Sequence, residues 1–128
     1  MQKAVAKTIA GFLNFEGGTL LVGVADDGTV VGIEHDLRTL QRQDLDGFEQ
    51  ALRQTISDLL GPEFNQLVRT GYEQLNGHSA ARVTVDPSPH PVYLREGGKT
   101  EFYVRAGNTT RPLELASALD YIQMHWNG

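Results

Sequence analysis

The sequence predicts an α+β domain with a mixed, mostly antiparallel sheet and about three helices. Apolar residues recur at helical spacing in three separate stretches, and several shorter stretches alternate or run apolar in the manner of strands. Two turn pairs, Asp27-Gly28 and Asn76-Gly77, join neighbouring strand-like stretches, which is typical of β-hairpins. Because strands follow strands through short turns, we expect antiparallel pairing. With 128 residues and no internal repeat or linker, residues 1–128 are expected to form a single domain.

Composition excludes several classes of function. The chain has no cysteine, which removes disulfides, thiolate metal sites and cysteine catalysis. No apolar run approaches the length of a membrane span, and the first residues do not resemble a signal peptide, so we expect a cytoplasmic protein with no membrane partner. The net charge is −5, with the acidity concentrated in residues 26–64. Affinity for nucleic acid is therefore expected to be modest and to depend on a local basic face.

The first predicted element is an amphipathic helix that begins at Lys3 and ends between residues 14 and 17. Lys3 and Lys7 lie four residues apart and form a cationic stripe. Residues 19–24 are apolar without polar alternation, which suits a strand covered on both faces, and a buried helix is the alternative that periodicity leaves open. Residues 29–33 are mostly β-branched and complete a hairpin after Asp27-Gly28. The apolar face of the helix consists of Val5, Ile9, Phe12 and Leu13.

Gly17-Gly18 has two readings. A phosphate-binding glycine loop leads from a strand into a helix N-terminus, where the helix dipole favours an anion. Here the order is reversed, because the glycines follow a helix, and no Gly-Lys-Ser/Thr comes after them. We therefore expect a tight connection that lets helix and strand pack closely, and an ATP-binding domain remains the alternative.

The middle of the chain predicts a second helix over residues 44–60, ended by Gly61-Pro62. Its apolar face consists of Leu45, Phe48, Leu52, Ile56 and Leu59. Residues 67–75 and 80–85 then flank Asn76-Gly77 and predict a hairpin. Apolar and polar residues alternate in its second strand, so one face is expected to be buried and the other wet.

The last third predicts an extended segment, a hairpin, a loop and a helix. Prolines at every second position from Pro87 to Pro91 forbid helix there. Residues 92–95 and 100–105 flank Gly97-Gly98 and predict a hairpin in which Phe102 and Val104 face away from Tyr103 and Arg105. Residues 107–112 are expected to form a polar loop, with Pro112 in the first turn of the last helix. The apolar stripe of that helix consists of Leu115, Leu119, Ile122 and Trp126.

Two stretches carry a family resemblance. In the first, Asn14-x-x-Gly17-Gly18 ends the helix and is followed, after the apolar strand, by G-V-x-D-D-G at residues 23–28. The second is F-Y-V-R-x-G-N-T-T-R-P-L at residues 102–113, followed by a helix. In this order they resemble the AlbA-like domain of Schlafen-type proteins over nearly the whole chain. The resemblance implies a DNA- or RNA-binding domain, here apparently lacking the family's leading strand.

Nuclease-active Schlafens have an acidic triad, so the resemblance also bears on catalysis. Its third acid matches Asp27 or Asp26, whereas the two glutamates of an E-S-x-x-x-E-F-K-like motif have no counterpart here. We therefore expect no catalytic residue, metal or cofactor; only a nuclease would use Asp27 as the catalytic acid and bind Mg²⁺ or Mn²⁺ through Asp26 and Asp27. From the residues alone, Asp26 and Asp27 together with Glu34 or Asp36 could offer carboxylate oxygens to a hard divalent cation. The alternative is that the two aspartates only form the turn.

The second signature supplies the candidate contacts to nucleic acid. Guanidinium, hydroxyl and amide groups suit phosphate and sugar, Tyr103 would stack on a base if it is exposed, and Lys7 adds a cation. The alternative is structural, with Thr or Asn capping the last helix and Arg105 paired with a carboxylate. The candidate polar residues are Arg105, Asn108, Thr109, Thr110 and Arg111.

The sequence thus predicts a nucleic-acid-binding, regulatory domain that is not catalytic as it stands. The alternatives are a metal-dependent endoribonuclease of the Schlafen type, a divergent ATP-binding domain and a pure oligomerisation domain. Two Schlafen lobes pack against each other, so the resemblance also makes a homodimer an expectation. The four histidines share no ligand spacing, and there is no G-x-S-x-G nucleophile motif.

Overall fold

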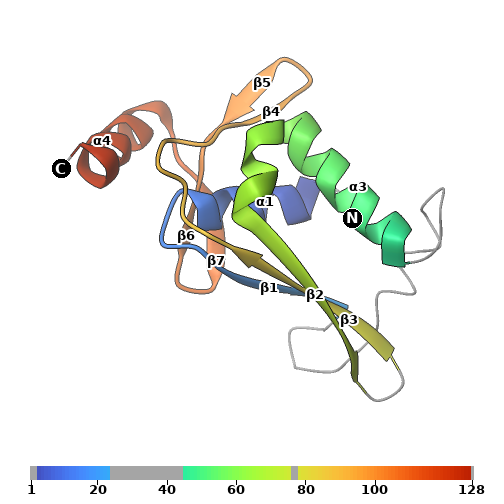
Figure 1. The fold of residues 1–128 in the computed structure, drawn as a ribbon. Coiled ribbons are helices and arrows are strands. Elements are labelled where there is room, and N and C mark those ends of the chain that lie inside the picture. The colour runs from blue at the N-terminus through green and yellow to red at the C-terminus, as the bar shows by residue number, and fades with distance from the viewer. Residues whose placement is uncertain (1–2, 24–44, 76–77, 128) are drawn as a thin grey trace.

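Helices and short antiparallel sheets alternate along the chain, which confirms the α+β prediction (Figure 1). The structure is a computed structural model that describes residues 3–23, 45–75 and 78–127. The hairpin expected around Asp27-Gly28 and the acids Asp26, Glu34 and Asp36 lie outside these residues. In Figure 1, α1 and α3 lie together, whereas α4 stands apart at the other end of the molecule from the β2–β3 tip.

Helix α1 (Lys3–Leu13) turns into strand β1 (Gly18–Val22) through a connection that only glycine allows. Gly17 has φ 78°, and a Cβ there would lie 2.4 Å from the Val85 carbonyl oxygen. A Cβ on Gly18 would lie 2.4 Å from the Phe12 ring. The paired glycines therefore let helix and sheet touch, as predicted. The close contacts at both glycines fit a tight connection, the interpretation preferred over a phosphate-binding loop.

The central sheet has the order β1-β3-β2 and is antiparallel. Strands β2 (Val68–Leu75) and β3 (His78–Val85) form the hairpin predicted around Asn76-Gly77. The core side carries Ala81, Val83 and Val85, which confirms the predicted alternation. The prediction that the strand after Gly18 is covered on both faces is wrong, because Leu21 is 51% exposed. Helices pack on the side of Leu20 and Val22, and Leu21 points to the other side.

Helix α3 (Leu45–Leu59) matches the second predicted helix and leads into the 3₁₀ helix η1 (Pro62–Leu67). Phe48, Leu52 and Ile56 are fully buried, and Leu45, at the end of the helix, is exposed. These side chains join α1 and the inner face of the sheet in the main core. The apolar periodicity of the sequence therefore identified the buried face correctly.

A carboxylate on α3 ties this helix to the central sheet. Glu49 accepts hydrogen bonds from Thr70 Oγ1 at 2.6 Å, the Tyr72 hydroxyl at 2.6 Å and Arg53 Nε at 2.8 Å. Burial alone would raise the pKa of Glu49, but these three donors stabilise the anion and bring the pKa below its ordinary value. Burial and the Glu49 carboxylate raise the pKa of Tyr72. The phenol therefore stays a hydrogen-bond donor.

The last third differs from prediction in its strands. One hairpin, β4 (Leu94–Glu96) and β5 (Lys99–Glu101), is followed by a second, β6 (Tyr103–Ala106) and β7 (Thr109–Pro112). Six strands follow α3 in the described residues, where the sequence predicted four. The expected polar loop at residues 107–112 is wrong, because residues 109–112 pair with β6 and leave Gly107-Asn108 as the turn. Pro112 ends β7 and lies outside the last helix.

Helix α4 (Leu115–Trp126) is fixed to the body by aromatic side chains. The Tyr121 hydroxyl donates to the Asn14 carbonyl oxygen at 2.5 Å, and Trp126 Nε1 donates to the Ser88 carbonyl oxygen at 3.0 Å. Both rings pack near Phe102 in a second, smaller core. The helix begins after Glu114 without a side-chain cap, so capping by Thr or Asn is ruled out. Ile122 and Trp126 are half-buried as predicted, but Leu115 and Leu119 face solvent.

Candidate nucleic-acid interface

The β6–β7 hairpin divides the predicted binding residues between two faces. Cross-strand partners share a face, and Arg105 pairs with Thr110 whereas Val104 pairs with Arg111. Arg105 and Thr110 thus face α1, while Arg111 lies on the other face. Asn108 lies in the turn, where Gly107 has φ 62°. The sequence treated these residues as one loop, but the strand pairing separates them.

One face of α1 lies along the strand that runs from β5 into β6. Lys3 Nζ is 3.5 Å from Glu101 Oε1, and Lys7 Nζ is 5.5 Å from the centre of the Tyr103 ring. A Cβ on Gly11 would lie 2.9 Å from Thr110 Cγ2 and 3.3 Å from the Arg105 amide nitrogen. Four helical residues rise about 6 Å, close to the roughly 6.6 Å of two strand residues, so the contacts stay in register.

Arg105 is built into this contact and is only partly available to a ligand. Its guanidinium lies over the Phe12 ring at 4.9 Å, and Nη1 donates to Thr110 Oγ1 at 2.9 Å. Its Nε is buried without a hydrogen-bond partner among the described residues. Among the described residues Arg105 therefore pairs with no carboxylate, and an aromatic ring and a hydroxyl hold it instead.

Tyr103 belongs to the core. It is 3% exposed, so its ring is not available for stacking on a base, and that conditional prediction fails. Burial, together with a hydrogen bond to the Glu101 carboxylate, raises the pKa of Tyr103 to about 12. Lys7 covers the same ring and is half-buried. Both residues consolidate the packing of α1 on β6.

The exposed part of the site is the tip of the hairpin. Asn108, Thr109 and Arg111 are exposed, and Thr109 Oγ1 donates to the Ala106 carbonyl oxygen at 3.0 Å. The Arg111 guanidinium has no ion-pair or hydrogen-bond partner within the described ranges. The tip therefore offers one amide, one hydroxyl oxygen and one unpaired guanidinium, groups that suit sugar and phosphate.

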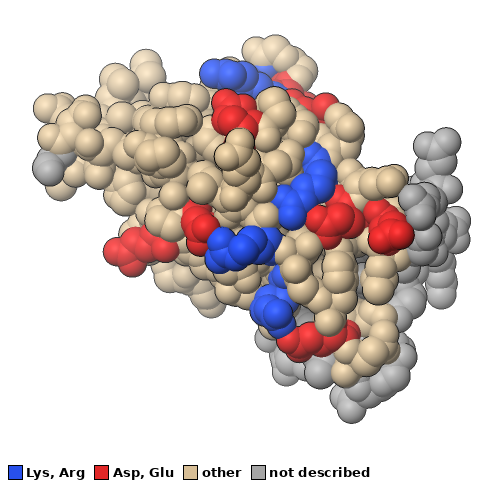
Figure 2. Space-filling view, in the orientation of Figure 1, with Lys and Arg blue, Asp and Glu red and all other residues tan. Residues whose placement is uncertain are grey.

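Basic charge does not dominate the surface that Figure 2 shows. Lysine and arginine side chains there alternate with acidic ones, and no broad basic area is visible. Arg69 pairs with Asp86, Arg82 pairs with Glu73, and Lys3 lies between Glu96 and Glu101. Carboxylates thus neutralise several of the described cations, including half of the cationic stripe predicted on α1.

A metal centre finds no support in the part of the chain that the structure describes. No three His, Asp or Glu residues gather there in a way that could hold an ion. The acids that a nuclease would use, Asp26 and Asp27, lie outside the described residues, as does His35. His90 packs against Phe64, and His125 stacks on Tyr121 with ring centres 5.1 Å apart.

Two residues that organise the site were not identified from the sequence as important for it. Asn14 is fully buried and bonds the backbone of Val92 and Tyr103, which places β6 against the end of α1. Gly11 lets the hairpin approach the helix. A glycine in the middle of an amphipathic helix was the available signal for Gly11, because it costs helix stability unless close packing requires it.

Comparisons with known proteins agree with the observed fold. The family model described as "Schlafen, AlbA_2" matches residues 1–114. The structure also resembles a solved protein of Corynebacterium diphtheriae, DIP2311, with a TM-score of 0.63 and 22% identity. That match covers 95% of this chain but 21% of the other, so the chain spans about a fifth of that protein's length, and the likeness concerns the fold alone.

A search of curated proteins found no match. None of the helices within residues 3–23, 45–75 and 78–127 is long and apolar enough to cross a membrane. The family model covers both signature stretches and most of the chain, and the fold has the expected α+β architecture. The chain therefore belongs to the Schlafen AlbA_2 family.

Proposed function

We propose that this chain is a DNA- or RNA-binding domain with a regulatory rather than a catalytic role. Membership of the Schlafen AlbA_2 family supports the class of ligand. The observation that carries the proposal is the exposed side of the β6–β7 hairpin, where the Arg111 guanidinium is unpaired within the described residues and lies on the same strand as Thr109, next to Asn108 in the turn. Such groups suit contacts to the sugar-phosphate backbone, and binding through those contacts alone would depend little on sequence.

The expected affinity is modest. Phosphate neutralisation supplies most of non-specific binding energy, and the site offers few free cations on a chain of net charge −5. Arg111 is the principal contact. Lys7 and Arg105 are half-buried, so their positive charges attract the ligand at a distance and do not bind it directly. Gly11, Asn14 and Thr110 position the hairpin and do not touch the ligand.

A fluorescence anisotropy titration tests the proposal. The probes are labelled 20-nucleotide RNA and DNA hairpins, measured between 25 and 200 mM salt. Arg111→Ala should weaken binding and lower the slope of log K against log salt by about 1, since one phosphate contact is lost. Arg69→Ala removes the same charge from the central sheet and should change binding little. Absence of binding at the lowest salt, or equal losses in the two variants, would refute the proposal.

A further inference from the structure

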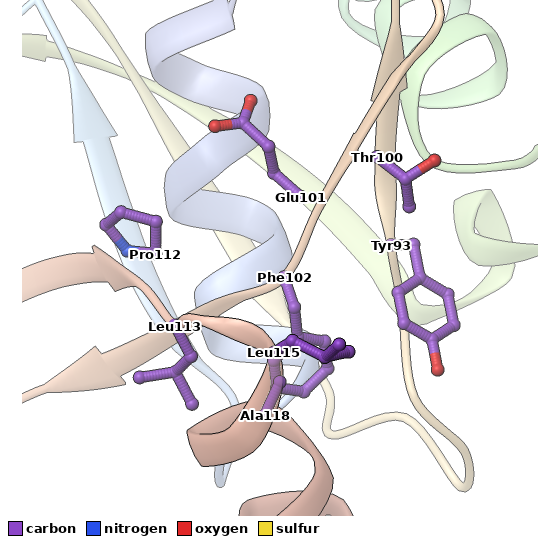
Figure 3. A pocket seen from close by; sticks show the side chains of 8 residues that line it. All are labelled: Tyr93, Thr100, Glu101, Phe102, Pro112, Leu113, Leu115 and Ala118. Atoms are coloured by element: carbon purple, nitrogen blue, oxygen red, sulfur yellow. The ribbon is translucent and has the colours of Figure 1, made fainter.

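A groove of about 380 Å³ opens between the β4–β5 hairpin and the start of α4. Its apolar lining consists of Tyr93, Phe102, Pro112, Leu113, Leu115 and Ala118. Figure 3 shows Phe102, Leu115 and Ala118 close together, whereas the Glu101 carboxylate points away from them. The volume is at the lower end of the range for ligand sites, which suits one or two apolar side chains.

Helix α4 extends this apolar surface beyond the groove. Leu115 is 77% exposed and Leu119 is 58% exposed, and the two lie one helical turn apart on the same side. Tyr121 and Trp126 fix the orientation of the helix through their hydrogen bonds to the body, and in this orientation both leucines stay exposed. A continuous exposed apolar surface of this kind marks an interaction site more often than single exposed residues do.

On the α4 side, the charged residues around the exposed leucines are all acidic. Glu114 precedes Leu115 and Asp120 follows Leu119, so the two carboxylates stand at the edges of the apolar stripe. Residues 112–127 contain no lysine or arginine. The opposite wall carries Arg95, whose guanidinium lies 5.7 Å from the centre of the Tyr93 ring. A complementary partner would therefore direct its cations toward α4.

Neither a second copy nor a lipid surface fits these features well. In a symmetric pair of α4 helices, Glu114 and Asp120 would meet the same two acids. Carboxylates at the rim also repel anionic lipid.

We propose that the groove and the exposed stripe of α4 bind a basic amphipathic helix of a protein partner. Apolar side chains of that helix, four residues apart, would occupy the groove and cover Leu119. Its lysines or arginines would pair with Glu114 and Asp120. The surface shares no residue with the one proposed for nucleic acid, so this inference stands whether or not the domain binds nucleic acid.

Isothermal titration calorimetry with two synthetic helical peptides tests the inference. Both have 14 residues and leucines four apart; one carries lysines beside the leucines, and the other carries glutamates at the same positions. The lysine peptide should bind at least tenfold more tightly than the glutamate peptide. Leu119→Ser and Asp120→Lys should each weaken that binding at least fivefold. Leu21→Ser is the control, because Leu21 is 51% exposed on β1, on the side of the central sheet away from the helices.

Four results would overturn the inference. The first is no binding of the lysine peptide at millimolar concentration, and the second is equal binding of the two peptides. The third is a dimer in sedimentation equilibrium that Leu119→Ser dissociates, which would assign the surface to a second copy of the chain. The fourth is binding to phosphatidylcholine–phosphatidylglycerol vesicles without binding of the lysine peptide. Far-UV circular dichroism of each variant verifies that α4 remains folded.

Discussion

Replacing Asn14 by alanine should lower the free energy of unfolding by about 3 kcal/mol, because three buried hydrogen bonds are lost at about 1 kcal/mol each. Asn14 Nδ2 donates to the carbonyl oxygens of Val92 at 2.9 Å and Tyr103 at 2.8 Å, and Oδ1 accepts from the Val92 amide at 2.8 Å. Val92 and Tyr103 are 1% and 3% exposed, so water cannot replace the missing side chain without opening the core. Asn14→Asp should cost at least as much, since a carboxylate oxygen would face two carbonyl oxygens.

Urea unfolding followed by Trp126 fluorescence and by far-UV circular dichroism measures this loss. Coincidence of the two transitions verifies two-state behaviour, and an m-value of about 2 kcal/mol/M puts the midpoint shift near 1.5 M. Asn127→Ala is the matched control, because Asn127 is exposed at the end of α4 and its loss should change stability by less than about 0.5 kcal/mol. If Asn14→Ala costs less than about 1 kcal/mol, these hydrogen bonds do not secure β6 to α1.

Two further predictions concern the packing of the hairpin and the acid stability of the fold. Gly11→Ala should destabilise the protein despite a gain of about 1 kcal/mol in helix propensity, and Thr110→Ser should relieve part of that loss in a double-mutant cycle, because the new Cβ meets Thr110 Cγ2 at 2.9 Å. The folded pKa of Glu49 lies below the ordinary 4.5, so its contribution to stability is present above that pH and is lost as the pH falls through the folded value. Glu49→Gln should therefore flatten the decline of the urea midpoint below pH 4.5, and an unchanged decline would contradict the assignment.

Local patterns in the sequence were sufficient to predict those elements whose structure depends mainly on residues close to them in the chain. Alternation identified the buried face of β3, and helical periodicity identified that of α3. The glycine pair after α1 was correctly interpreted as a close connection, because a helix precedes it. These signals depend on residues a few positions apart, which the sequence displays directly.

The candidate site was harder to predict because its geometry depends on strand pairing. Residues 107–112 are polar and include a glycine and a proline, which is typical of a loop, yet four of them pair with β6. That pairing turns Arg111 away from Arg105 and makes Thr110 a contact of Gly11. Tyr103 lies on one face of its strand, and the apolar Phe102 and Val104 lie on the other. Because both faces carry large side chains, the sequence did not reveal which face α1 would cover.

By itself the sequence determined the fold class, the helices, the central hairpin and the resemblance to the Schlafen AlbA-like family. Only the tertiary structure decided that Tyr103 is buried, that Arg105 is held by Phe12 and Thr110, and that α4 exposes leucines beside an apolar groove. The physical reason is that an element's own periodicity specifies which side chains share a face. Whether that face meets the core, another element or solvent depends on residues distant in the chain, such as Asn14, which joins α1 to β6 across 89 positions.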